Sequence, residues 1–494
     1  MARQKITVRM ARNILGDCFL LTFQPVRPDG SDGRPTSILI DFGVLQAVNG
    51  ARELMQTIGS SIRDLCGGHL DYLVITHEHA DHISGFAHAG SLFFDTAGAP
   101  AISIGTLWMA WTENPKDEQA QALRARHAPA LALFEALASP DGSGLGADDR
   151  KAYQAALDVF AFNALPVAPE AASVAGEVTV GGAASTVQAR RRTGAQIMEA
   201  LKKTARQVDF LEPGDLRLIE DPARQAPPLK VHVLGPPRDR DLLYRSDPSG
   251  RNPETYLVDP SDTETLLAAT GRTIDGGTVR PLTAPPTLFP DRYVALAKAD
   301  PEGDDGAWRT DDQAVRDLWA GYQAERDRIL TVDGPGAAER LALKLDSDTN
   351  NTSLVLAFEL ADGQVLLFAA DAQVGNWLSW DRQRYPARVE DGGPGVEIHE
   401  LLSRVRLYKV GHHGSHNATI RMPGLESMTH PGLEVMIPVV EAVARKQGRS
   451  GWKMPDPDLN KRLDEKAPGR IRRGDDRLQA GEDAVWVRWE LTVA

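Results

Sequence analysis

Residues 74–82 read Val74-Ile75-Thr76-His77-Glu78-His79-Ala80-Asp81-His82, and this stretch decides how the rest of the chain is interpreted. The apolar run from Tyr72 to Thr76 is typical of a buried β-strand, and three histidines and an aspartate follow it at once. Neutral imidazole and carboxylate groups are the ligands that a borderline divalent metal ion prefers. Because only 12 of the 494 residues are histidines, three of them directly after an apolar strand favour a metal site over a polar surface loop.

The spacing His-x-His-x-Asp-His places four possible ligands on one tight loop. A loop that leaves a strand can direct His77 and His79 toward one ion, and Asp81 and His82 toward a second. The spacing therefore predicts a site for two metal ions.

Two later stretches end in the same kinds of side chain. The apolar run 364–369 is followed by Asp371, and the run 404–410 is followed by His412 and His413. A site with two ions needs a carboxylate that can bridge them, and an aspartate directly after an apolar strand is well placed for this role. By itself, Asp371 is more readily explained as a helix N-cap or a turn residue. Three stretches that share this chemistry nevertheless indicate one common site.

Length and composition limit the class of protein. A chain of 494 residues can form several ordinary domains, or one large core that carries insertions. No run of about 18 apolar residues occurs, and the N-terminus enters a strand pattern without an apolar signal region. Only two cysteines, Cys18 and Cys66, are present, so no disulfide framework is implied. We therefore expect a cytoplasmic protein without a membrane partner.

The charge of the chain bears on its partners. A formal net charge of −13 repels a polyanion at long range and weakens a general role in coating nucleic acid. It does not exclude a nuclease, because bound metal ions are the largest local charges in such a site. Two basic clusters lie at residues 190–206 and 470–473. Most such clusters are solvated faces rather than binding sites.

Hydrophobic patterning predicts the elements around the site. The predicted strands of the first part are 5–10, 18–23, 37–43 and 72–76, and a helix is predicted at 51–65. The predicted strands of the later part are 229–235, 352–358, 364–369, 404–410 and 485–493. The second and third of these are expected to pair around the turn signal Ala361-Asp362-Gly363.

Between these strand-rich parts the pattern changes. Residues 96–225 indicate a mainly helical insertion, and residues 239–345 a second insertion that is partly loop. The helices expected there are 115–137, 147–165, 193–208 and 311–330. The prediction is a single domain with a core of about 1–95, 226–238 and 346–494.

Taken together, these stretches resemble the metallo-β-lactamase superfamily, whose signature is the His-x-His-x-Asp-His motif. They resemble closely one branch of it, the hydrolase domain of ComEC-type competence proteins and its free-standing relatives. The stretches that carry this resemblance, besides residues 77–82, are Gly16-Asp17-Cys18, Val233-Leu234-Gly235-Pro236-Pro237, Asn350-Asn351-Thr352-Ser353-Leu354-Val355-Leu356, Leu366-Leu367-Phe368-Ala369-Ala370-Asp371-Ala372 and Lys409-Val410-Gly411-His412-His413-Gly414-Ser415. Ala370 stands where that branch has glycine. The resemblance implies an α/β fold, the four-layer αββα sandwich, and has no counterpart for the two insertions.

The resemblance also implies a set of metal ligands. The first ion would be held by His77 and His79, and the second by Asp81 and His82, with Asp371 bridging them. Either His412 or His413 would complete the second site. Because neighbours on a strand point in opposite directions, only one of these two is expected to be a ligand.

Further residues receive expected roles from the same resemblance. Many members of the superfamily have another histidine on the first ion, and His232 is the candidate on a strand, although a core histidine is the more ordinary interpretation. Glu78 is expected to lie behind the ligands, and Ser415 to contact the substrate. His416 is expected to contact the substrate or to protonate the leaving group.

The hypothesis is a metal-dependent hydrolase that uses a hydroxide activated by two divalent ions, zinc or manganese. Asp81 would orient the hydroxide, and the free histidine of the His412–His413 pair, or His416, would protonate the leaving group. The resemblance favours a phosphodiesterase or nuclease, acting on nucleic acid or a nucleotide. The alternatives are a hydrolase of small esters, lactones or thioesters on the same fold, or a non-catalytic protein with a structural metal site. The insertions are candidate surfaces for a protein partner.

Overall fold

The computed structural model describes residues 3–45, 47–94, 99–125, 186–220, 227–248, 254–255, 272–275, 278–281, 346–383, 395–447 and 451–493. The chain divides into two compact units. One unit is Met1–Leu257 with Leu341–Ala494, and the other is Val258–Arg340. In the second unit, the described residues form one antiparallel hairpin of β9 (Arg272–Asp275) and β10 (Thr278–Pro281). All that follows concerns the first unit.

Two seven-stranded sheets form the centre of the first unit. The strands of the first sheet are, in spatial order, β16 (Trp486–Val493), β1 (Arg3–Ala11), β2 (Phe19–Val26), β3 (Thr36–Ile40), β4 (His69–Val74), β5 (Ser103–Ala110) and β6 (Gln207–Leu211). The strands of the second sheet are β15 (Ile471–Arg473), β14 (Glu434–Ile437), β13 (Val405–Lys409), β12 (Val365–Phe368), β11 (Val355–Glu359), β8 (Leu229–Gly235) and β7 (Leu216–Ile219). Both sheets are mixed: β3 to β6 are parallel in the first, and β12 to β15 are parallel in the second.

The two sheets pack face to face around an apolar layer. Alternate residues of each strand enter this layer, as expected for strands with one face on the partner sheet. Aromatic pairs cross it: the ring centroids of Phe19 and Phe368 are 5.5 Å apart, and those of Phe23 and Phe358 are 6.4 Å apart. This close packing fixes the position of one sheet against the other. It therefore also fixes the positions of their strand ends relative to one another.

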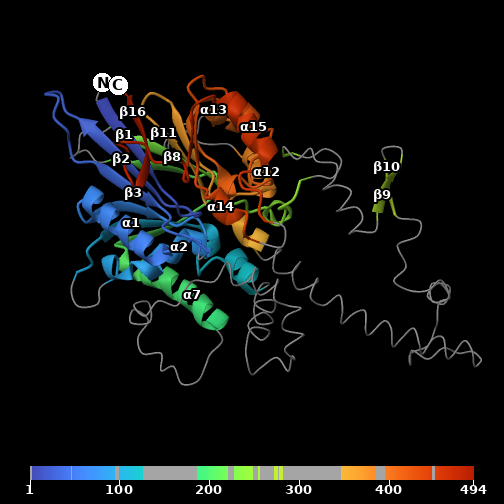
Figure 1. Cartoon of the computed structure of the whole chain (residues 1–494), viewed down its shortest axis with the longest axis horizontal. Helices are drawn as coiled ribbons and strands as arrows, with labels where there is room; N and C mark the ends of the chain where they lie inside the picture. Colours follow the sequence, from blue (N-terminus) through green and yellow to red (C-terminus); the bar gives the residue numbers. More distant parts are fainter. Residues whose placement is uncertain are drawn as a thin grey trace, which may run out of the picture. The chain divides into compact units, whose positions relative to one another are not determined.

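Helices cover the outer faces of the sheets (Figure 1). The helices beside the first sheet are α1 (Ala51–Cys66), α2 (Ala80–His88) and α7 (Thr186–Thr204). The helices beside the second sheet are α12 (Val374–Ser379), α13 (Ile398–Ser403), α14 (Glu441–Ala444) and α15 (Pro457–Lys466), and α8 (Arg240–Leu243) packs on α12. The short 3₁₀ turns are η1 (Gly90–Leu92), η2 (Trp111–Glu113), η4 (Trp380–Arg382), η5 (Gly411–Gly414) and η6 (Leu425–Ser427). The architecture is thus the αββα sandwich, and the predicted fold class is confirmed.

The predicted strands of the first and last parts of the chain are all present, as is the helix at 51–65, with ends that shift by a few residues. The predicted pairing of 352–358 with 364–369 is also present, as the antiparallel ladder between β11 and β12. No described helix is long and apolar enough to cross a membrane.

The region 96–225 differs from the prediction. It contains β5 and β6, which extend the first sheet in parallel with β4, and β7, which is an edge of the second sheet. The helix expected at 193–208 is α7, which begins earlier and ends at Thr204, because residues from Gln207 onward pair with β5. The sequence pattern does not separate these strands because they lie between segments with helical periodicity.

The other elements expected in the insertions are only partly visible. Residues 118–125 are helical, in agreement with the start of the helix expected at 115–137. The rest of that helix, and the helices expected at 147–165 and 311–330, lie outside the described residues.

Candidate metal centre

The metal motif occupies the connection between β4 and α2. His77 lies in the loop after the strand, His79 is the N-cap residue of α2, and Asp81 and His82 lie in the first helical turn. The loop is held against the end of β3, because the amide of Phe42 donates to the carbonyl oxygen of His82. The motif is therefore supported by a neighbouring strand on one side and by a helix on the other.

The remaining candidates follow the ends of other parallel strands. Asp41 follows β3, Asp371 follows β12, and His412 and His413 follow β13. Because the carboxyl ends of parallel strands meet at one edge of a sheet, each sheet contributes its residues from a single edge. The packing of the two sheets then brings both sets together.

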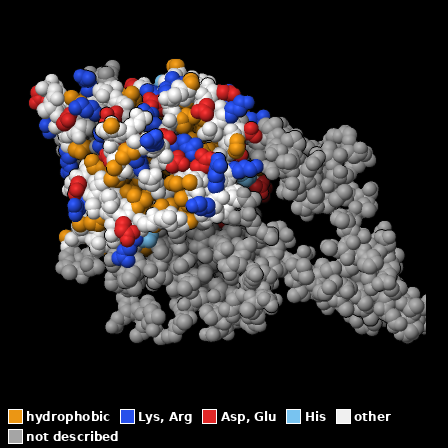
Figure 2. Space-filling model, viewed as in Figure 1, with side chains coloured by type: hydrophobic (Ala, Val, Ile, Leu, Met, Phe, Trp, Pro, Cys, Tyr) orange, Lys and Arg blue, Asp and Glu red, His pale blue; other side chains and the backbone are white. Residues whose placement is uncertain are grey.

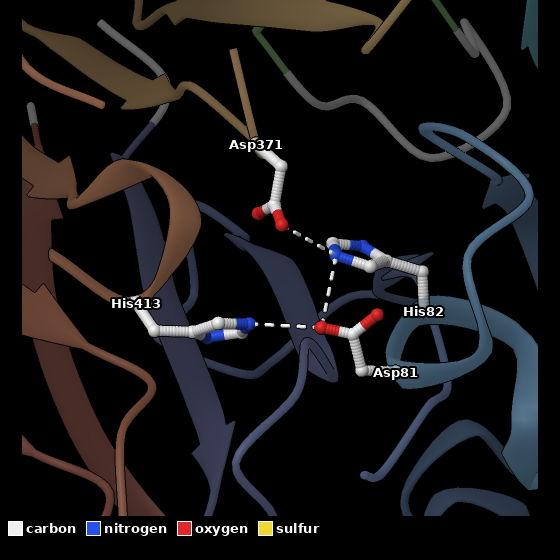
Figure 3. A group of neighbouring side chains, drawn as sticks. All are labelled: Asp81, His82, Asp371 and His413. Carbon is white, nitrogen blue, oxygen red and sulfur yellow. Dashed lines mark hydrogen bonds and ion pairs between the residues drawn. The ribbon is translucent and has the colours of Figure 1, made fainter. Parts of the chain in front are cut away.

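Four predicted ligands form one buried group. Asp81, His82, Asp371 and His413 each offer a ligand atom, and these atoms all lie within 4.8 Å of one another. Figure 3 shows Asp371 and His413 reaching toward the Asp81–His82 pair from separate segments of the chain. The Nε2 atom of His413 is 2.9 Å from Oδ2 of Asp81, and Nε2 of His82 is 3.2 Å from Oδ2 of Asp371. Two imidazoles and two carboxylates are a donor set that fits a divalent ion such as zinc.

A hydrogen bond at Nδ1 orients each histidine of this group. Nδ1 of His82 donates to Oδ2 of Asp41 over 2.8 Å, and Nδ1 of His413 donates to the carbonyl oxygen of Pro438 over 2.7 Å. Thr76 donates to the same Asp41 carboxylate from its backbone amide and its hydroxyl group. Such partners fix the tautomer of a metal-binding histidine and leave Nε2 directed at the ion.

His77 and His79 lie beside this group but are not members of it. Their ring centroids are 4.6 Å apart, and the ring of His77 lies 4.1 Å from that of His82. Nδ1 of His77 is 3.3 Å from the hydroxyl oxygen of Ser353, whereas its Nε2 is buried and has no hydrogen-bond partner among the described residues. A buried nitrogen without a partner is costly unless a ligand completes it, so His77 also fits a metal ion.

The two neighbouring histidines after β13 have separate places. His413 is in the buried group, whereas Nε2 of His412 is 3.9 Å from Oδ2 of Asp371 and its side chain is 17% exposed. Nδ1 of His412 lies 2.9 Å from the hydroxyl oxygen of Ser415. Both histidines have positive φ values, of 41° and 53°, so they have left the strand and do not alternate as strand residues do.

Other sequence candidates lie away from the group. His232 is buried on β8, and its Nε2 is 2.8 Å from Oε2 of Glu359 on the adjacent β11. This contact agrees with the core interpretation of His232 rather than with a metal ligand. Glu78 and His416 are exposed, and within the described part of the chain no contact joins His416 to the four grouped side chains.

Strained backbone concentrates at this edge of the sandwich. Five non-glycine residues have positive φ among the residues described, and four of them lie at the site: Asp41, Ala370, His412 and His413. Such conformations cost about 1–3 kcal/mol each and persist where the surrounding structure enforces them, commonly at functional sites. The φ of 48° at Ala370 also gives a physical reason for glycine at this place in the ComEC-type branch.

The interior of the site carries an excess of negative charge. The carboxylates of Asp17, Asp41, Asp81 and Asp371 are all 5% exposed or less. Lys409, itself 1% exposed, forms an ion pair with Asp17 and lies 3.7 Å from Oδ1 of Asp371. Four buried carboxylates exceed the positive charge of Lys409 and of His82, whose pKa is raised. This excess favours the binding of further positive charge, which divalent ions would provide.

The pKa values respond to this environment. Burial lowers the pKa of His82, but the carboxylates of Asp371, Asp81, Asp41 and Asp17 outweigh it and hold that pKa well above the ordinary range. Burial raises the pKa of Asp81, but His82 and the hydrogen bond from His413 bring it to about 2. Burial holds the pKa of His77 well below its ordinary value, so that this imidazole is neutral, as a metal ligand must be.

Sequence reasoning missed the supporting residues. Asp41 lies within the predicted strand 37–43, and Lys409 lies within the stretch 409–415 that carries the resemblance. The signal for Asp41 was its place directly after a buried strand next to the strand of the metal motif. Asp346, discussed below, had no signal in its own pattern.

Comparison with known proteins agrees with the site. Residues 34–166 match the family model described as Metallo-beta-lactamase superfamily. The matched range begins just before β3 and contains α1, β4, the His-x-His-x-Asp-His loop and α2. No curated protein matches the chain.

The αββα fold and the buried ligand group agree with this match, which supports a likeness to the metallo-beta-lactamase superfamily over residues 34–166. The superfamily consists mostly of metal-dependent hydrolases, which supports an enzyme of that general kind.

Proposed function

We propose that this protein is a phosphodiesterase with two divalent metal ions in its active site. The observation that carries the proposal is the buried group of Asp81, His82, Asp371 and His413, whose ligand atoms lie within 4.8 Å of one another. Two such ions, zinc or manganese, supply water that is ionised near neutral pH and neutralise the charge that grows on phosphoryl oxygens.

The hydrogen bonds of the imidazole rings indicate which histidine nitrogens are left to bind an ion. Asp81, His82 and His413 would hold the second ion, because Nδ1 of both histidines is already engaged and each Nε2 faces a carboxylate. His77 and His79 would hold the first ion. Asp371 would be shared by the two ions, as the resemblance implies, because it faces His82 and its charge also opposes the lowering by burial of the pKa values of His77 and His79.

The chain also offers groups for proton transfer. Asp81 would orient the attacking water through its carboxylate, which is ionised at neutral pH because its pKa is about 2. His412 is better placed than His413 or His416 to protonate the leaving oxygen. Its Nε2 lies at the edge of the group and its side chain is partly exposed, whereas both nitrogens of His413 have partners.

The substrate class rests on the resemblance to the ComEC-type branch and on the charge that such a site neutralises. Nucleic acid is the less favoured phosphodiester. In the cluster at 470–473, Arg472 pairs with Glu434, and Arg473 pairs with Asp475 and Glu441, so the charge of these two arginines is already neutralised. Basic and acidic side chains are interspersed over the face shown in Figure 2. These features favour a nucleotide or another small phosphodiester over a long polyanion.

The same neutralised surface favours a second candidate, hydrolysis of a small ester, lactone or thioester. A metal centre of this kind polarises a carbonyl oxygen as readily as a phosphoryl oxygen. The two candidates share their ligands and differ only in the substrate.

The test is hydrolysis of bis(p-nitrophenyl) phosphate and of p-nitrophenyl acetate by protein loaded separately with zinc and manganese. We expect turnover of the phosphodiester, and its loss in Asp371→Ala and His79→Ala. Turnover of the acetate alone would establish the second candidate. Full phosphodiesterase activity of His79→Ala with tightly bound metal would show that the ligand assignment is wrong.

A further inference from the structure

The first metal site has only two histidines from the His-x-His-x-Asp-His loop, and His232 is engaged elsewhere. Besides the shared Asp371, a further ligand of this site would come from another segment near His79. The segment 346–353, which leads into β11, lies against the site at two points. A further ligand of the first ion is therefore to be expected in this segment.

Two contacts place the carboxylate of Asp346 at the first site. Oδ1 of Asp346 is 3.9 Å from Nε2 of His79. The other oxygen, Oδ2, accepts a hydrogen bond of 3.3 Å from the side-chain amide of Asn350. One oxygen is thus bonded within the turn, and the other lies near the imidazole nitrogen of His79 that would bind the ion.

The segment is fixed to the metal loop rather than merely near it. The backbone amide of Leu354 donates to the carbonyl oxygen of Thr76, directly before His77. Ser353 contacts both His77 and the backbone amide of Asp371. The side-chain oxygen of Asn351 accepts from the amides of Gln373 and Asn376. These bonds fix the turn that carries Asp346 against the metal loop and against the segment that begins at Asp371.

We propose that Asp346 is a ligand of the first metal ion, in the place where many members of the superfamily have a third histidine. The proposal rests on the proposed function, because it assumes that His77 and His79 bind an ion. A carboxylate at this place makes the first site richer in oxygen than a site with three histidines. Oxygen ligands suit harder ions. The first site would therefore bind zinc less strongly and would accept manganese more readily.

The ordinary interpretation of Asp346 is a polar residue at the start of a short helical turn. In that role, its carboxylate would stabilise the turn through Asn350 and would not affect metal binding. The two interpretations predict different numbers of bound ions when an amide replaces the carboxylate of Asp346. The number falls if Asp346 is a ligand, and it stays the same if Asp346 only stabilises the turn.

The experiment compares wild type with Asp346→Asn, Asp346→His and the matched control Asp348→Asn. Asp348 is two residues further along the same turn, and its substitution makes the same change of charge and shape. Each protein is stripped with chelator, reloaded with zinc or manganese, and freed of excess metal. Bound metal is then counted by mass spectrometry, and the dissociation constant of each ion is measured by competition with a chelator. The absorption spectrum of the cobalt-loaded protein reports on the ligands.

We expect wild type and Asp348→Asn to keep two ions, and Asp346→Asn to keep one. The affinity of the lost ion should fall by roughly 100-fold or more, beyond the ~10–100-fold that loss of an outer partner causes. Asp346→His should keep two ions, bind zinc more tightly at the first site and change the cobalt spectrum. This variant shows that a loss in Asp346→Asn does not reflect unfolding of the turn.

Three other results would overturn the inference. Two ions bound to Asp346→Asn with wild-type affinity would show that Asp346 is not a ligand. Loss of an ion from Asp348→Asn as well would assign the effect to the turn. Failure of the wild-type protein to bind any ion would reject the proposed function itself, and is thereby distinguished from the first two.

Discussion

Nδ1 of His82 donates to the carboxylate of Asp41 over 2.8 Å, and both side chains are completely buried. This bond joins the end of β3 to the first turn of α2 and directs Nε2 of His82 toward Asp371. The same carboxylate accepts two hydrogen bonds from Thr76. Asp41 thus fixes both the backbone of the loop and the tautomer of one ligand without reaching the ion itself.

Replacement of Asp41 by Asn is expected to weaken binding of the second ion by about 10–100-fold. An amide in place of the carboxylate removes the charge that makes His82 a stronger ligand. Chelator competition measures the change. Asp362→Asn, in the turn between β11 and β12, is the control and should retain wild-type affinity. Unchanged affinity in Asp41→Asn would mean that the His82–Asp41 bond serves folding alone.

Much of this centre is predictable from sequence because its residues lie directly after apolar strands. The His-x-His-x-Asp-His loop is compact enough to recognise without a structure. The choice between His412 and His413 is not predictable from sequence. The rule that neighbouring side chains alternate applies to strands, and these two residues have left-handed backbone. The role of Asp41 depends on the parallel pairing of β3 with β4, which no local pattern reveals. In the same way, β5 and β6 are recognisable only as neighbours of β4.

Gly43→Ala should disturb the metal loop through crowding. A Cβ atom at Gly43 would lie 2.2 Å from the carbonyl group of Asp81 and 2.3 Å from the backbone nitrogen of His82. The loop would have to move, at a cost of about 1–3 kcal/mol in the free energy of unfolding. Urea denaturation measures this cost. Gly90→Ala is the control, since its nearest neighbour is a side-chain atom of Phe94 at 3.4 Å. Equal stability of the two variants would contradict the close approach seen here.

Removal of metal is expected to lower the thermal stability of the protein. Without divalent ions, the carboxylates of Asp17, Asp41, Asp81 and Asp371 face one another with only Lys409 and His82 as cations beside them among the described residues. An ion that binds only the folded state stabilises it by about 2.7 kcal/mol at a free concentration of 100 times its Kd.

Calorimetry of protein treated with chelator, before and after addition of zinc, checks this expectation. The melting temperature should rise on addition of zinc in the wild type, and much less in Asp371→Ala. An equal rise in both proteins would place the stabilising ion at another site.

Glu113 is expected to make stability depend on pH. Burial and the charge of Glu78 raise the pKa of Glu113 from 4.5 to about 7 in the folded protein. The folded state therefore holds this proton to higher pH than the unfolded state, and stability falls as pH rises from about 4.5 to about 7.

Glu113→Gln removes this dependence. A shift of that size corresponds to at most about 3 kcal/mol, and the partial exposure of Glu113 reduces it to about 1–2 kcal/mol. Chelator-treated Glu113→Gln should thus be more stable than wild type at pH 8 and equally stable near pH 4.5, by urea denaturation at each pH. The exposed Glu118→Gln is the control. A difference that is the same at both pH values would exclude the titration of Glu113 as its cause.

His412 and His416 can be separated by the leaving group of the substrate. The Nε2 atom of His412 lies 3.9 Å from Asp371, whereas His416 is exposed. If His412 protonates the leaving oxygen, its replacement by Asn should lower kcat by about 10²–10⁴-fold for a phosphodiester with an alkoxide leaving group. The loss should be much smaller for p-nitrophenolate, which departs without a proton. His416→Asn should change neither rate. Equal losses for both leaving groups in His412→Asn would assign His412 to binding of metal or substrate instead, because only a proton donor is sensitive to the basicity of the departing oxygen.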